Sequence, residues 1–149
     1  MEPISSPTAI GNFILPNVKI DLSMDPHEAI RVTGRRGYIG QAIYSAPRGS
    51  SSEVDMYFFS VGCRISHKDL LEKYEALGLV PADPFALAAA NQAYPKFADN
   101  HPNATQWIGD NSKIYIAVFN SWYAGSGVYE SRSGVFSDKW WFAGVSKSA

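Results

Sequence analysis

The sequence predicts an α+β fold in which an antiparallel sheet of about five strands carries two or three helices on one face, with an extended arm at the N-terminus. Three observations predict it. Aromatic, strand-like runs fill the last third of the chain, and three earlier segments begin with residues that cap helices. Prolines interrupt the first residues of the chain, whose apolar positions follow no helical period.

Residues 1–24 form the predicted arm. The segment contains three prolines, Pro3, Pro7 and Pro16. Its apolar side chains, which include Phe13 and Leu15, would be costly to expose, at roughly 25 cal/mol per Å². We therefore expect the arm to lie against its own domain or against another subunit. Residues 25–149 are expected to form a single domain.

Each of the predicted helices starts at a side chain that can accept hydrogen bonds from the first free backbone N–H groups. These capping residues are Asp25, Ser66 and Asp83, and a proline follows both aspartates. The first helix should end near Thr33, the second at Gly78 and the third near Tyr94, where Pro95 follows. The pattern of residues 38–44 leaves a short strand and a helical turn equally open.

The strands are predicted from β-rich runs and from the turns between them. A first strand is expected from Val54 to about Cys63. Residues 113–119 are apolar at odd and even positions alike, so both faces of that strand need cover. Turn-forming residues separate the later strands at 109–112, 124–127 and 131–138. Short turns join antiparallel neighbours, because parallel strands need a dozen or more residues to cross over.

Composition limits the classes of protein to which this chain can belong. A chain of 149 residues with a net charge of −1 fits one globular domain with no general attraction to nucleic acid or to anionic membranes. The single cysteine, the absence of a signal-peptide pattern and the absence of a long apolar run predict a soluble protein of the cytoplasm, free or within a larger particle.

No pattern in the sequence predicts catalysis, a metal site or a cofactor. Cys63, His67 and Asp69 are close in sequence and could in principle form an activated thiol. His67 and Asp69 lie two residues apart in a predicted helix, however, so their side chains point in different directions. The histidines lack the spacing of metal ligands, and no phosphate-binding or dinucleotide motif occurs. The polar segment 99–103, on a predicted connection from Lys96 onward, supports a small hydrolase-type enzyme only as the second alternative function.

Basic residues are concentrated between Ala29 and Ser52, where no acidic residue occurs. Four of the six arginines lie there, interleaved with two tyrosines: Arg31, Arg35, Arg36, Arg48, Tyr38 and Tyr44. Arginine and aromatic side chains together suit phosphate contact and base stacking. A nucleic-acid-binding accessory protein that uses Arg35, Arg36 and Tyr38 is therefore the first alternative function.

The aromatic surplus favours a protein interface. Ten of the twenty Phe, Trp and Tyr residues lie between Thr105 and Val145, and Trp140, Trp141 and Phe142 are consecutive. Neighbours in a strand point to opposite faces, so Trp141 must face away from the other two. We predict a non-enzymatic interaction or structural subunit. Its partner would be another protein or a second copy of the chain, bound through Phe13, Leu15 and Trp141.

Overall fold

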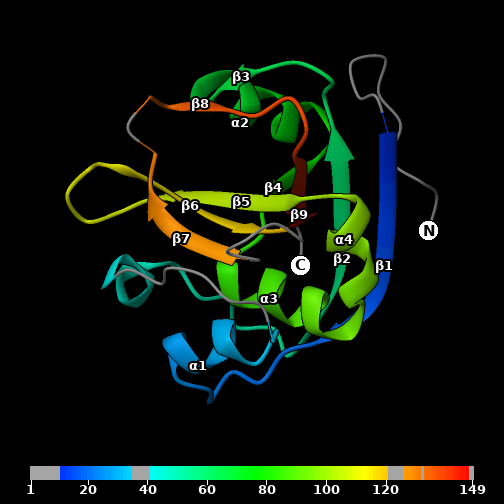
Figure 1. The fold of residues 1–149 in the computed structure, drawn as a ribbon, viewed down its shortest axis with the longest axis vertical. Helices are drawn as coiled ribbons and strands as arrows, with labels where there is room; N and C mark the ends of the chain where they lie inside the picture. Colours follow the sequence, from blue (N-terminus) through cyan, green and yellow to red (C-terminus); the bar gives the residue numbers. More distant parts are fainter. Residues whose placement is uncertain (1–10, 35–40, 121–125, 132, 148–149) are drawn as a thin grey trace.

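The computed structural model describes residues 11–34, 41–120, 126–131 and 133–147, and its strands form two sheets (Figure 1). The main sheet has seven strands: β1 (Gly11–Lys19), β2 (Glu53–Ser60), β4 (Leu79–Pro81), β5 (Asn103–Ile108), β6 (Ile114–Phe119), β7 (Ser126–Glu130) and β9 (Trp141–Ser146). The second sheet pairs β3 (Ile65–Ser66) with β8 (Val135–Phe136). The described helices are α1 (Pro26–Arg31), α2 (His67–Ala76), α3 (Pro84–Ala93) and α4 (Pro95–Asn100), with a 3-10 turn, η1 (Gln41–Ser45).

The main sheet is mixed. Its strand order is β1-β2-β9-β5-β6-β7, with β4 also paired to β9, and every pair is antiparallel except β5 and β9, which run parallel at Asn103↔Trp141 and Ala104↔Phe142. The prediction of a purely antiparallel sheet of about five strands is therefore wrong. Short turns determine the antiparallel pairing only of strands that follow one another in the sequence, here β5, β6 and β7. The chain then passes through β8 in the second sheet and returns as β9 between β2 and β5.

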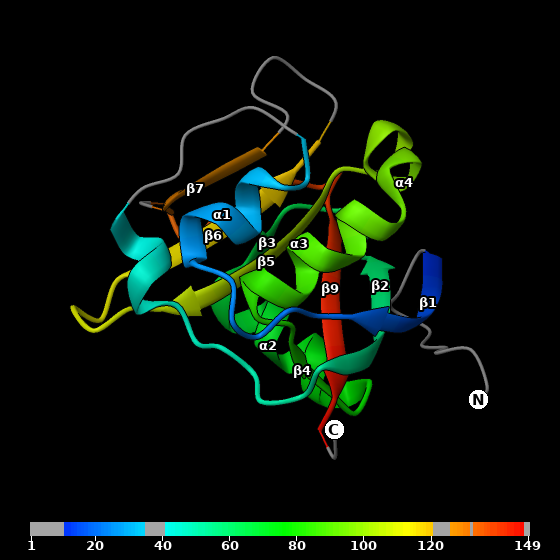
Figure 2. The ribbon, with the colours of Figure 1, turned by 90° about the horizontal axis from the view of Figure 1, so that it is seen from below.

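Both faces of the main sheet are covered, so the prediction of helices on one face is also wrong. Consecutive residues of β2 enter two different apolar clusters: Met56 and Phe58 the first, Tyr57 and Phe59 the second. Helices α1 and α3 pack on the first face, as Figure 2 shows from below, while α2 and the β3–β8 pair cover the second (Figures 1 and 2). In β6 the apolar residues at odd and even positions divide between the same two clusters.

The three predicted helix caps are confirmed. The side chain of Asp25 accepts a hydrogen bond from the N–H of His27, Ser66 accepts one from Asp69, and Asp83 accepts from two N–H groups of α3. The glycines that follow α1 and α2 both have positive φ, +77° at Gly34 and +73° at Gly78, the left-handed conformation that ends helices.

Most of the described part of the predicted arm, residues 11–24, forms strand β1, which pairs antiparallel with β2 at the edge of the main sheet. Its register shifts between Leu15 and Val18, where Pro16 has no N–H to donate and Asn17 has a φ of 57°. The N–H of Asn17 donates instead to a side-chain oxygen of Asp55, at 3.0 Å. This bulge interrupts the pairing between Leu15 and Val18, and the pairing resumes where Val18 lies opposite Val54.

Helix α4 replaces most of the polar connection expected from Lys96 onward. Pro95 occupies its first turn, where a proline costs no hydrogen bond, and Ala98 is fully buried beneath it. The N–H of His101 donates to the carbonyl of Phe97, at 2.7 Å, which closes the last turn. The tertiary contacts of Phe97 and Ala98, rather than local propensity, account for this helix.

Candidate functional site

A groove of about 420 Å³ opens at the edge of the main sheet, where β1, α4 and β9 meet. Its apolar wall consists of four aromatic side chains from these three elements and from the residue before α4: Phe13, Tyr94, Phe97 and Trp141. Its polar groups are Asn12, Lys96, Asn100 and His101. We call this site the aromatic groove.

The aromatic rings of the groove pack against one another and remain partly exposed. Phe97 is at the centre, stacked on Phe13 at 5.0 Å between ring centroids and edge-on to Trp141 at 5.8 Å. Below it lies Phe58 of β2, at 4.6 Å and only 2% exposed. Tyr94, by contrast, is 40% exposed, and Phe13, Phe97 and Trp141 are half-buried. The buried ring of Phe58 thus supports a layer of rings that stays partly exposed.

His101 brings a polar, titratable group against the aromatic wall. Its ring centroid lies 5.0 Å from that of Phe97 and 5.0 Å from that of Trp141. The strand that carries Trp141 is tied to the same segment, because the N–H of Trp141 donates to the carbonyl of Pro102, at 2.7 Å. His101 and Trp141 are therefore held together by backbone as well as by ring contacts.

A pair of buried amides lies directly after His101 and anchors this side of the groove. The side chains of Asn91 in α3 and Asn103 in β5 donate to each other, at 2.7 and 3.0 Å. Asn103 also donates to the carbonyl of His101, at 3.2 Å. Asn103 is the first residue of β5 and the register partner of Trp141, so the pair fixes α3 and β5 relative to the start of β9.

The groove carries little charge. Among its lining residues, Lys96 has the one permanent charge, and none is an aspartate or a glutamate. A cation such as a quaternary ammonium group would meet Lys96 without a compensating carboxylate, whereas aromatic cages for such cations depend on favourable electrostatics. Neutral or acidic groups suit the groove better.

The structure places two of the predicted binding residues, Phe13 and Trp141, in the groove. Leu15 packs against the adjacent core cluster and does not line the groove. The other three predicted residues, Arg35, Arg36 and Tyr38, lie outside the described residues.

Two other arginines of the basic segment are described. Arg31 is exposed at the end of α1. Arg48 is placed by contacts within the protein, because its guanidinium lies 4.4 Å from the ring centroid of Phe85 and donates to the carbonyl of Asp21. Packing on an aromatic face and a carbonyl acceptor account for the position of Arg48 without a ligand.

The remaining groove residues were not predicted as binding residues. The sequence predicts Tyr94 at the end of a helix and Phe97 in a polar connection, and it indicates His101 only as part of the polar segment 99–103. The signal that could have found them is the spacing of Phe97 and His101, four residues apart after Pro95, which places them one helical turn apart. Asn103, from the same polar segment, is fully buried in its pair with Asn91.

The Cys63, His67 and Asp69 group shows no catalytic arrangement. Within the described residues no hydrogen bond joins these three side chains, and Cys63 is exposed. The ring of His67 lies edge-on to Phe136, at 6.3 Å, and its two buried nitrogens have no partner in the described chain. Burial lowers the pKa of His67 from its ordinary value.

Among the helices of the described residues, none has the length and apolarity needed to span a bilayer.

The comparisons with known proteins found no similarity: no protein-family model, no curated protein and no solved structure matches this chain.

Proposed function

We propose that the protein is a non-enzymatic interaction subunit that binds a short segment of a partner protein in the aromatic groove. The observation that carries the proposal is the convergence of partly exposed rings from β1, α4 and β9 on one hollow. Aromatic side chains are enriched where protein interfaces hold most of their binding energy. They supply a large contact area at a small cost in side-chain entropy.

The size and chemistry of the groove favour one or two side chains as its contents. A volume of about 420 Å³ falls in the range typical of small-ligand sites, about 300–1,000 Å³. The wall offers ring faces to an apolar group, while Lys96 and the amides of Asn12 and Asn100 offer donors to a carboxylate or carbonyl. We therefore infer a segment that presents an apolar side chain close to an acidic one.

The hydrolase-type alternative receives less support from the groove. A hydrolytic site needs a nucleophile, or a pair of acids, within reach of a base. Among the described residues of the lining, His101 is the candidate for that base, and these residues include no serine, cysteine or carboxylate. The nucleic-acid alternative depends on Arg35, Arg36 and Tyr38 and stays a prediction.

Selection from a phage-displayed library of random dodecapeptides tests the proposal. We expect enrichment of sequences that combine an acidic residue with an aromatic, proline or branched apolar residue. Synthetic copies of these peptides should bind at least tenfold more weakly to Trp141→Ala, and more weakly to Lys96→Glu in a salt-dependent way. Lys96 is exposed, so its substitution leaves the fold intact.

Leu71→Ser is the matched control, because Leu71 is exposed on α2, against the opposite face of the sheet. Its affinity for the selected peptides should equal that of the wild type. The proposal is wrong if no peptide is enriched over the Trp141→Ala protein, or if the selected peptides bind equally well after both groove substitutions.

A further inference from the structure

The hairpin that joins β5 to β6 ends in an exposed apolar residue beside an exposed acid. Ile108, the last residue of β5, is 58% exposed, the largest exposed fraction among the big apolar side chains of the described residues. Asp110 lies two residues further on, in the turn, and is also exposed. An exposed isoleucine at a strand end is costly in water, so a partner that covers it would gain from its burial.

The turn is braced by its own hydrogen bonds. The N–H of Gly109 donates to the carbonyl of Lys113 and the N–H of Ser112 donates to the carbonyl of Gly109, both at 2.9 Å. The side-chain amide of Asn111 donates to the hydroxyl of Tyr115, at 2.8 Å. A loop held in one conformation loses little entropy when it docks, which favours it as an inserting element.

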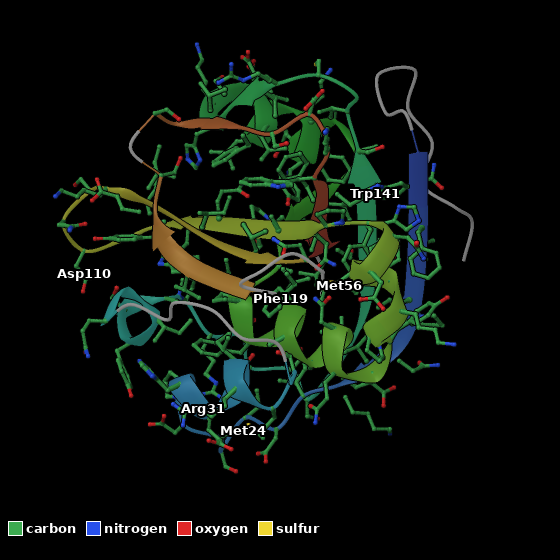
Figure 3. All side chains as sticks on the ribbon, viewed as in Figure 1. Met24, Arg31, Met56, Asp110, Phe119 and Trp141 are labelled. Atoms are coloured by element: carbon green, nitrogen blue, oxygen red, sulfur yellow. The ribbon has the colours of Figure 1, made fainter. Side chains whose placement is uncertain are left out.

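The hairpin tip and the groove lie at opposite ends of the molecule. Figure 3 labels Asp110 at the far left, beyond the end of β5, and Trp141 on the right, beside β1 and β2 (Figure 3). The tip of one molecule therefore cannot reach the groove of the same molecule, but it can reach the groove of a second one.

The two surfaces are complementary in chemistry. The tip presents one apolar side chain, Ile108, and one free carboxylate, Asp110, whereas the groove presents aromatic rings and the ammonium group of Lys96. The neighbouring cation of the hairpin, Lys113, lies 3.8 Å from Glu130, so its charge is offset within its own chain. This is the combination of apolar and acidic groups that the groove favours.

We propose that the β5–β6 hairpin tip of one copy of this chain inserts into the aromatic groove of a second copy, with Ile108 against Phe97 and Trp141 and with Asp110 near Lys96. The inference rests on the proposed function, because it names the occupant of the same groove. The two surfaces differ, so a single contact of this kind leaves one free tip and one free groove, and further copies can add there to build chains or rings.

The assembly should be weak and dependent on concentration. Insertion of one hairpin tip belongs to the small class of interfaces, below about 1,200 Å² of total buried surface, which are typical of transient contacts. Sedimentation velocity from low micromolar to near-millimolar protein should show growth from monomer to higher species. Asp110→Lys alone and Lys96→Glu alone should each shift this growth to at least tenfold higher concentration.

Two combinations make the test specific. The double variant Asp110→Lys with Lys96→Glu restores opposite charges across the contact, so its assembly should return toward that of the wild type. An equimolar mixture of Ile108→Ser and Trp141→Ala proteins should stop at one-to-one dimers, because only one intact tip and one intact groove can meet. Leu71→Ser should assemble as the wild type does.

A wild type that stays monomeric at every concentration would overturn the inference, and so would a double charge variant that fails to assemble. These failures are distinguishable from failure of the proposed function. If the peptide library still selects ligands that depend on Trp141, the groove binds another protein, and only the identity of its occupant is wrong.

Discussion

Breaking the amide pair between Asn91 and Asn103 should destabilise the protein, largely because the remaining asparagine is left buried without its hydrogen-bond partner. Asn103→Ala removes both bonds of the pair, at 2.7 and 3.0 Å, and the bond to the carbonyl of His101, at 3.2 Å, each contributing about 1 kcal/mol net. It also leaves the side-chain oxygen of Asn91 buried and unpaired, because Asn91 is only 2% exposed, at a further cost of about 1–3 kcal/mol. The free energy of unfolding should therefore fall by about 4–6 kcal/mol.

The double variant Asn91→Ala with Asn103→Ala removes both partners and leaves neither side chain unpaired. Its cost should be smaller than the sum of the two single costs by about 1–3 kcal/mol, the coupling typical of contacting polar residues. Domains of this size usually have about 5–15 kcal/mol of stability, so the single variants should still fold, though marginally.

Equilibrium unfolding in urea, followed by tryptophan fluorescence, measures these differences from the midpoints at a common slope. The reasoning would be refuted if the cost of the double variant equalled the sum of the single costs within about 0.5 kcal/mol. Asn100→Ala is a suitable control, because Asn100 is exposed at the end of α4, and its midpoint should stay close to that of the wild type.

Three further predictions concern the second face of the sheet. Burial lowers the pKa of His67, so the unfolded chain binds a proton at this residue more readily than the folded chain does. The free energy of unfolding should therefore fall as the pH drops below about 6.5. His67→Phe should reduce this pH dependence, as measured by urea titrations at several pH values. Gly144→Ala would place a methyl group 2.9 Å from the ring of Tyr74, so the urea midpoint should drop by an amount equivalent to about 1–3 kcal/mol; an unchanged midpoint would contradict this close contact. Tyr74→Phe removes one buried hydrogen bond, 2.7 Å long, to the carbonyl of Ala143, and should cost about 0.5–1.5 kcal/mol by the same measurement, without a change in the fold by circular dichroism.

Local signals predicted the parts of the fold that depend on local physics. Asp25, Ser66 and Asp83 cap their helices because a side-chain oxygen reaches N–H groups only two or three residues ahead, whatever the rest of the chain does. The parallel contact of Asn103 with Trp141 could not be predicted in this way. It depends on where β9 returns after a long excursion, and no turn or periodicity encodes that position.

The candidate site was predictable in part for the same reason. Trp141 stood out because a strand turns it away from Trp140 and Phe142, and Phe13 because an apolar side chain on an extended arm is costly to expose. Phe97 and His101 did not, since the sequence predicts that Pro95 ends one helix and does not indicate that it starts another. A helix of six residues is too short to show a period, and its existence depends on contacts with β1 and β9.

Half-exposed aromatic rings gather at one edge of the sheet, and their position there supports the proposed interaction surface. On the face covered by α2 and the β3–β8 pair, Phe59, Phe136 and Phe142 are at most 1% exposed, so packing alone explains them. On the other face α3 covers the middle of the sheet, but the short helix α4 leaves the rings of the groove half-exposed. If this part of the sheet were only the edge of the core, smaller aliphatic side chains would fill it as well, because the stabilisation from an apolar side chain grows with the area it removes from water. Rings that stay half-exposed against a rigid layer are better explained by a partner that completes their burial.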